Sequence, residues 1–181
     1  MRFKFANIFA ASAVASVIVM TGCASIVSLQ PFVTEKDATV EPELLGTWLD
    51  AEGKDTFVIG AKGAGYAFTY IEKSGTAYKF DGRLWKIGDA MVLDLVTTNE
   101  APFHLPVHFA MRVWVDGDSL RMAFFDTDWF KRLVGEKLAN QKVDDRLVIT
   151  ATPEAIRAFY LAYAGDERAH GDPDTLHRTG R

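Results

Sequence analysis

The chain has 181 residues, of which 24 are acidic and 20 basic, so its formal net charge is −4 at pH 7. This length suits one domain with its own core. The single cysteine, Cys23, excludes an intramolecular disulfide, so the domain must fold on its apolar core alone. An acidic chain without a cluster of Lys or Arg is a poor partner for nucleic acid or for an anionic membrane surface.

The first 22 residues have the layout of a secretory signal peptide. Arg2 and Lys4 precede an uncharged apolar stretch over residues 8–20, and small residues follow it. This stretch has 13 residues, whereas a membrane-spanning helix needs about 20. We therefore expect residues 1–22 to be removed from the mature protein.

The residues Met20-Thr21-Gly22-Cys23 resemble the lipobox of bacterial lipoproteins. In that family the cysteine sulfur receives a diacylglycerol, the leader is cut before the cysteine, and the new N-terminus receives an acyl chain such as palmitate. The resemblance implies a protein of the cell envelope that is held on a membrane through lipid on Cys23. Ala24 stands where an Asp commonly retains lipoproteins at the inner membrane, which implies the periplasmic face of the outer membrane.

Cleavage before Cys23 leaves 159 residues with a formal charge of −6. Two alternatives stay open: an unmodified thiol in an uncleaved leader, and a catalytic thiol, for which no activating base is evident nearby. Residues 23–43 have no sustained hydrophobic period and contain Pro31 and Pro42. We expect them to form the lipidated N-terminus and a tether, although their few apolar residues could dock on the domain.

From Leu44 onward, runs of alternating apolar residues are separated by turn residues such as Ser74-Gly75 and Asp116-Gly117, which are hairpin signals. Consecutive hairpins predict a mainly β domain, an up-and-down antiparallel barrel of about eight strands with no free edges. An open, curved sheet with helices on its concave side is the alternative. The predicted strands cover residues 46–50, 55–61, 66–73, 77–87, 91–97, 107–115, 119–125 and 146–150.

Alternation along the strands sorts the side chains into two faces. One face is apolar and faces the core. The other face mixes charged residues with Trp85, Trp114 and Phe125, which would suit a protein partner if they were exposed together. The apolar face either lines a cavity for an apolar ligand or forms a filled core, and the predicted helices favour filling because they offer apolar stripes to occupy the space. The candidate ligand-binding residues on this face are Tyr66, Phe68, Tyr70, Tyr78, Phe80 and Met111.

Two helices are predicted near the C-terminus. The first, at about 127–138, follows capping residues that include Asp126, and the second, at about 153–164, follows Thr152 with Pro153 at its first position. Residues 165–181 are polar and rich in turn residues, so we expect a disordered tail. The folded domain is therefore expected to span residues 44–164.

The residues Gly46-Thr47-Trp48 resemble the Gly-x-Trp opening of lipocalins, and Thr127-Asp128-Trp129 resembles a second motif of that family, Thr-Asp-Tyr. The resemblance implies a lipocalin-like barrel in which Trp48 is a structural plug at one end and Arg146 stacks over it. Lipocalins usually place a long loop after the first strand, whereas only residues 51–54 follow it here, so the chain is lipocalin-like in a limited sense.

No nucleophile or nucleotide-binding motif stands out. The Gly-rich residues 60–65 join two predicted strands and precede no helix, so they predict a hairpin turn. His104 and His108 could point the same way, but no third metal ligand has a motif spacing. We therefore assign no catalytic residue, no metal and no cofactor.

The sequence thus predicts a lipid-anchored envelope protein with a non-enzymatic binding role. Its ligand is expected to be a small apolar molecule in the barrel. Two alternatives stay open: a module that interacts with or inhibits another envelope protein, and an enzyme with an unrecognised site.

Overall fold

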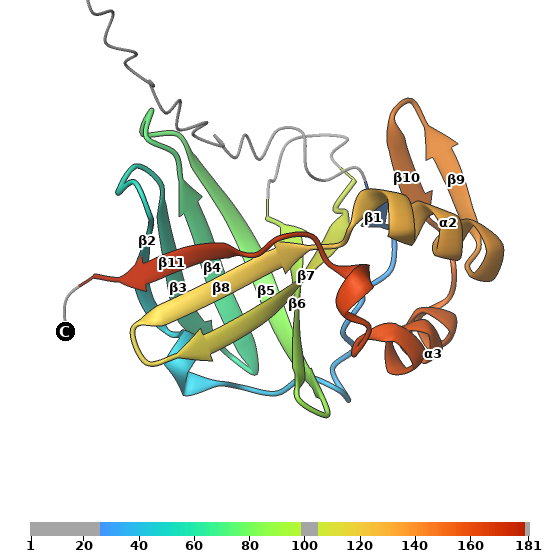
Figure 1. Ribbon diagram of the computed structural model, residues 1–181, viewed down its shortest axis with the longest axis horizontal. Helices are drawn as coiled ribbons and strands as arrows, with labels where there is room; N and C mark the ends of the chain where they lie inside the picture. The colour runs from blue at the N-terminus through green and yellow to red at the C-terminus, as the bar shows by residue number, and fades with distance from the viewer. Residues whose placement is uncertain (1–25, 99–104, 180–181) are drawn as a thin grey trace, which may run out of the picture.

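A computed structural model describes residues 26–98 and 105–179 and shows a β-barrel with a helical layer against one side (Figure 1). Cys23 and the predicted leader lie outside these residues, as does His104. Within the described ranges, none of the helices has the length and apolar character needed to span a membrane.

Eight antiparallel strands form the wall of the barrel, and seven of them follow one another in space as they do in sequence. The eighth, β11 (Asp174–Arg178), pairs with β8 on one side and β2 on the other and so closes the ring. The predicted up-and-down antiparallel barrel is therefore confirmed. The seven consecutive strands are β2 (Gly46–Asp50), β3 (Thr56–Lys62), β4 (Gly65–Ile71), β5 (Ala77–Ile87), β6 (Ala90–Thr97), β7 (His108–Asp116) and β8 (Ser119–Phe124).

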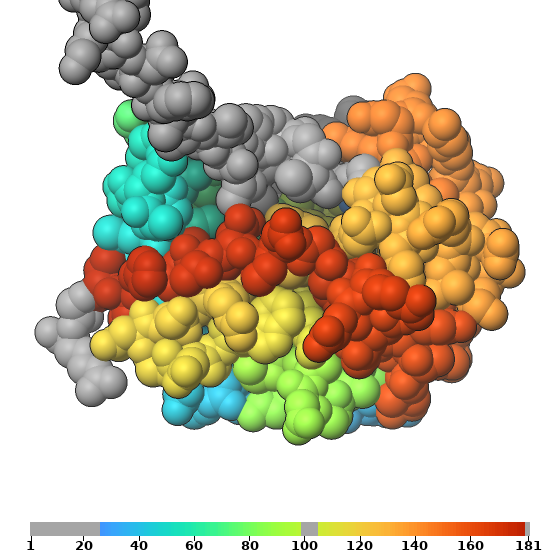
Figure 2. Space-filling view, in the orientation of Figure 1, coloured from blue at the N-terminus to red at the C-terminus, as the bar shows by residue number. Residues whose placement is uncertain are grey.

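The closing strand differs from the one that the sequence predicted. The predicted last strand, observed as β10 (Arg146–Ile149), lies outside the barrel between β9 (Asn140–Val143) and β1 (Ile26–Ser28). The barrel is closed instead by β11, from the segment expected to be a disordered tail, and Figure 2 shows β11 packed between β8 and the β2–β3 hairpin. Only Leu176 of β11 is buried, which is too little periodicity to mark a strand in the sequence.

The segment expected to be a tether packs on the domain. Its first residues form β1, in which Ile26 and Val27 are buried, and Phe32 and Val33 are buried further on. We call residues 29–45 the strap, because they run along the outside of the barrel to its far end. There the short helix η1 (Pro42–Leu44) places Leu44 in the barrel core.

The two predicted helices are confirmed as α2 (Thr127–Lys137) and α3 (Pro153–Tyr163). Each begins at the expected cap: Asp126 accepts from the Trp129 backbone N–H at 2.7 Å, and Thr152 accepts from that of Ala155 at 3.3 Å. The helices pack on the outer face of the barrel wall, where their apolar residues form a second core with Trp85, Val92 and Ala110 of β5, β6 and β7. A short helix, η2 (Glu167–Ala169), connects α3 to β11.

This helical layer covers part of the face that we considered for a protein partner. Trp85 is only 6% exposed, and the Phe125 ring lies 4.2 Å from that of Phe130. Trp114 is half-buried and lies between the guanidinium groups of Arg112 and Arg121. The three aromatic residues therefore do not form one exposed patch.

Trp48 closes one end of the barrel. Its ring is fully buried, its Nε1 donates to the Leu44 carbonyl at 3.0 Å, and the Arg178 guanidinium lies 4.1 Å above it. Arg178 also donates to the Leu45 carbonyl at 2.6 Å. The prediction that Arg146 stacks over Trp48 is wrong. Arg146 is exposed on β10, and the arginine above Trp48 is Arg178 of the closing strand.

Candidate functional site

The opposite end of the barrel opens into a cavity of about 440 Å³, which we call the mouth cavity. The β2–β3 and β4–β5 turns lie at this end, on the upper left of Figure 1. Charged residues ring the opening, among them Asp50, Lys54, Asp55, Lys73 and Asp174. The wall below them is formed by the apolar or aromatic side chains of Phe57, Tyr70, Met111, Met122, Phe124 and Leu176.

Tyr70 joins the apolar wall to the charged rim. Its ring stacks on Phe57 at 4.9 Å, and its hydroxyl donates to Asp55 Oδ2 at 2.9 Å. Burial, together with the hydrogen bond to the Asp55 carboxylate, raises the pKa of Tyr70 well above its ordinary value. The phenol therefore stays protonated at neutral pH and presents a fixed polar group at the edge of the cavity.

Asp174 occupies the rim at the first residue of the closing strand. Burial raises the pKa of its carboxyl above the ordinary value. Lys54, on the β2–β3 turn, pairs with Glu52 beside it. The opening thus carries both signs of charge around an apolar interior.

The structure places the six predicted ligand-binding residues at different depths. Tyr70 and Met111 line the mouth cavity, and Tyr78 is 39% exposed beside the opening. Phe68 and Phe80 are buried against each other in the filled part of the barrel, with their ring centroids 6.1 Å apart. Tyr66 lies nearest the closed end, where its hydroxyl accepts from the backbone N–H of Glu41 at 2.7 Å.

The barrel is therefore filled in its closed half and hollow in its open half. The predicted helices do not enter it, because their apolar stripes are used on the outer face. Met122 and Phe124 line the cavity from β8, on the side where alternation along the predicted strand 119–125 places its apolar residues. Leu176 was missed because it comes from the segment that the sequence predicts to be disordered.

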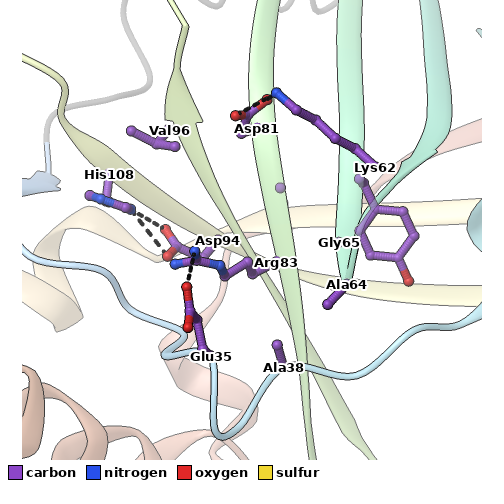
Figure 3. A pocket seen from close by; sticks show the side chains of 12 residues that line it. Glu35, Ala38, Lys62, Ala64, Gly65, Asp81, Arg83, Asp94, Val96 and His108 are labelled. Atoms are coloured by element: carbon purple, nitrogen blue, oxygen red, sulfur yellow. Dashed lines mark hydrogen bonds and ion pairs between the residues drawn. The ribbon is translucent and has the colours of Figure 1, made fainter.

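A second hollow, of about 560 Å³, lies outside the barrel between the strap and the wall, and we call it the outer groove (Figure 3). Its charged side chains are paired within the groove. Lys62 Nζ donates to Asp81 at 2.6 Å, and Arg83 donates to Glu35 of the strap at 3.3 Å. These pairs leave little unbalanced charge for a ligand.

The strongest polar contact of the outer groove is made by Asp94. This carboxylate is only 3% exposed, and its Oδ2 accepts from the backbone N–H groups of Phe32 and Val33 at 3.1 and 3.2 Å. Nδ1 of His108 lies 3.1 Å from both carboxylate oxygens (Figure 3). Asp94 therefore fastens the strap to the barrel wall, and His108 completes its shell of hydrogen-bonding partners.

Across residues 26–98 and 105–179, His, Cys, Asp and Glu side chains form no group of three or more that could hold a metal ion. Within the closing strand, Asp174 lies at the mouth, whereas His177 is exposed near the closed end.

A scan against protein-family models found no match to this chain, and searches of curated proteins and of solved structures found no match either.

Proposed function

We propose that this protein is a non-enzymatic binding module that holds a small apolar ligand in the mouth cavity. The observation that carries the proposal is an apolar cavity of about 440 Å³ with one open end, opposite the end that Trp48 closes. Ligand sites are typically apolar hollows of this size with a few polar groups, and eight-stranded barrels commonly hold one small ligand.

The wall chemistry predicts the kind of ligand. Phe57, Met111, Met122 and Phe124 offer flexible and aromatic surfaces that adapt to a chain or a ring. Each methylene removed from water contributes about 0.8 kcal/mol, so about eight methylenes contribute about 6 kcal/mol before the entropic cost of binding. We therefore expect micromolar or weaker affinity, with a polar end of the ligand at the charged rim.

The proposed place of action is the cell envelope, with lipid on Cys23 and the domain at the periplasmic face of the outer membrane. Support for this comes from the lipobox resemblance of residues 20–23 and from the short apolar leader before them. The intact mass of the chain isolated from its own membrane tests the lipid. An unmodified full-length chain would contradict the localisation.

A catalytic role receives less support. The His108–Asp94 pair resembles the pairs that orient a general base, but general-base catalysis also needs a reacting group within reach of the free ring nitrogen. The hydroxyl opposite His108 in the sheet belongs to Ser28, which is fully buried and accepts from the Gln30 backbone N–H. We therefore assign the pair to fastening the strap.

Titration with a fluorescent fatty acid tests the proposal. Met111→Trp places a large ring in the cavity, and we expect the affinity for the probe to fall about tenfold or more. Val58→Trp is the matched control, because Val58 is 36% exposed and lies outside the cavity, so its affinity should equal that of the wild type. Thermal melts of both variants show that each is folded. Equal probe binding by all three proteins would contradict a ligand in the cavity.

A further inference from the structure

We infer that the barrel docks with its mouth cavity facing the membrane that carries its anchor. The partner surface is thus the lipid bilayer itself. This inference rests on the proposed lipidation of Cys23 and deepens the proposed function, because it names the source of the ligand.

The first step is the length of the chain between the anchor and the fold. Three Cα–Cα steps separate Cys23 from Ile26, so the backbone between them spans at most about 11 Å. Ile26 is already fixed: it pairs with Leu147 of β10 and is only 8% exposed. The domain therefore has almost no slack and must hold the start of β1 next to the bilayer surface.

The second step is the position of β1 relative to the mouth cavity. Ser28 of β1 pairs with His108, the first residue of β7, and β7 begins at the open end of the barrel. In Figure 1, β1, the tip of the β9–β10 hairpin and the β4–β5 turn all lie on the upper side, whereas η1 and the β5–β6 turn lie on the lower side. The attachment point is thus beside the mouth and far from the Trp48 end.

The third step is the distribution of exposed apolar side chains. Of the seven large ones within the described ranges, Val143 is at the tip of the β9–β10 hairpin, Tyr78 is the second residue of β5 at the open end, and Leu29 and Leu105 flank the start of β7. These four are 38–64% exposed. Apolar and tyrosine side chains at one end of a domain suit insertion at the headgroup level of a bilayer.

Charge does not orient the domain. The rim of the mouth cavity carries Asp50, Glu52, Asp55 and Asp174 against Lys54 and Lys73, so it offers no excess of basic charge to an anionic bilayer. The orientation therefore comes from the short link and from apolar contact, and it should change little with salt. With the mouth against the bilayer, an acyl chain of a lipid in that bilayer reaches the cavity without crossing water.

The test uses full-length, lipidated protein in vesicles of phosphatidylethanolamine and phosphatidylcholine, whose headgroups carry no net charge. Lipid occupies Cys23, so an introduced cysteine is the only free thiol. Lys73→Cys places a fluorophore on the β4–β5 turn, and Asp89→Cys places one on the β5–β6 turn at the closed end, where both native residues are exposed. Nitroxide-bearing headgroups should quench the label at position 73 several-fold more strongly than the label at position 89, at low and high salt alike.

A longer link supplies the control. A Gly-Ser insert of about 12 residues between positions 25 and 26 adds roughly 20 Å of reach, so quenching at position 73 should fall towards that at position 89. Fatty-acid binding, measured on unlabelled protein that keeps Lys73, should not change with the insert, because the insert lies outside the mouth cavity. Equal quenching at the two positions without the insert, stronger quenching at position 89, or the absence of lipid on Cys23 would each overturn the inference. Fatty-acid binding with any of these results leaves the proposed function standing, and loss of that binding with the expected quenching refutes the function alone.

Discussion

At the scale of single residues, Asp94 shows how one buried carboxylate fixes a long segment. It accepts hydrogen bonds from two backbone N–H groups of the strap and lies against the ring of His108, and the residue is only 3% exposed. A buried charge needs such partners, because its desolvation is otherwise uncompensated. The strap therefore depends on this side chain more than on its exposed ion pairs.

Asp94→Ala should lower the free energy of unfolding by about 3 kcal/mol, because two backbone donors lose their acceptor in a buried site. Asp81→Ala is the matched control: its carboxylate also pairs, with Lys62, but the side chain is 43% exposed, so the loss should stay below about 1 kcal/mol. Urea unfolding measures both. Equal losses in the two variants would show that Asp94 does not fasten the strap.

Gly46 has a steric role in the Trp48 plug. Its φ is +143°, and a Cβ there would lie 2.5 Å from Nη1 of Arg178, which crosses above Trp48. The glycine of the Gly-x-Trp sequence thus leaves room for the arginine of the closing strand. This interaction joins the first and the last strand of the barrel.

Gly46→Ala should destabilise the protein by about 2 kcal/mol, because it adds a methyl group against Arg178 in a backbone conformation that suits glycine. Gly60→Ala is the control, since the nearest atom to its added Cβ would be 3.9 Å away, and its effect should stay within about 0.5 kcal/mol. Thermal unfolding of both variants gives the comparison. A Gly46→Ala protein as stable as Gly60→Ala would contradict this role of the glycine.

At the scale of elements, a half-buried histidine, His170, precedes the closing strand. His170 pairs with Phe125 just before β11, and burial, assisted by the nearby charge of Arg112, lowers the pKa of His170 to about 4. Asp166 opposes this shift only in part. The imidazole is therefore neutral in the folded state at neutral pH, and protonation favours release of the segment that leads into β11.

The sign of the pH dependence follows from the lowered pKa. Between the ordinary value of 6.5 and about 4 the unfolded chain binds more protons at His170, so stability is lost as pH falls through this window, by about 3 kcal/mol at most. His170→Phe should remove that part of the loss, whereas the exposed His177→Phe should not. Urea midpoints from pH 7 to pH 4 measure it. Parallel profiles for the wild type and His170→Phe would contradict the prediction.

The elements differ in how far the sequence could predict them. Strands β2–β8 carry clear alternation bounded by glycine turns, and α2 and α3 begin at strong caps, so their positions were predicted within a few residues. β11 has only one buried side chain, whereas β10 is more apolar. The hydrophobic pattern therefore favoured β10 as the strand that closes the barrel, although β11 closes it. Pairing between distant segments leaves no local signal in a single sequence.

The candidate site was predictable in part for the same reason. Alternation identifies which side chains point inward, and this was sufficient for Tyr70 and Met111. The depth of each residue depends on the stagger of the closed barrel and on where the helices pack. Tyr66, Phe68 and Phe80 therefore belong to the filled part although they share the inward face with Tyr70.

At the scale of the whole molecule, two apolar cores share one wall. Strands β5, β6 and β7 bury one face inside the barrel and the other under α2 and α3, and the strap links the two sides through pairs such as Asp37–Arg157 and Glu41–Lys86. In this arrangement the helices pack on the outside of the barrel and do not fill its interior. It leaves the open half of the interior free to hold a ligand.

Native mass spectrometry of the protein isolated from its own membrane tests the central claim most directly. The wild-type protein should carry a small apolar molecule bound non-covalently, in addition to the lipid mass on Cys23. Met111→Trp should carry the same covalent lipid without that molecule, because the indole occupies the mouth cavity. A wild-type protein with no bound molecule, or the same molecule retained by Met111→Trp, would contradict a ligand-binding barrel.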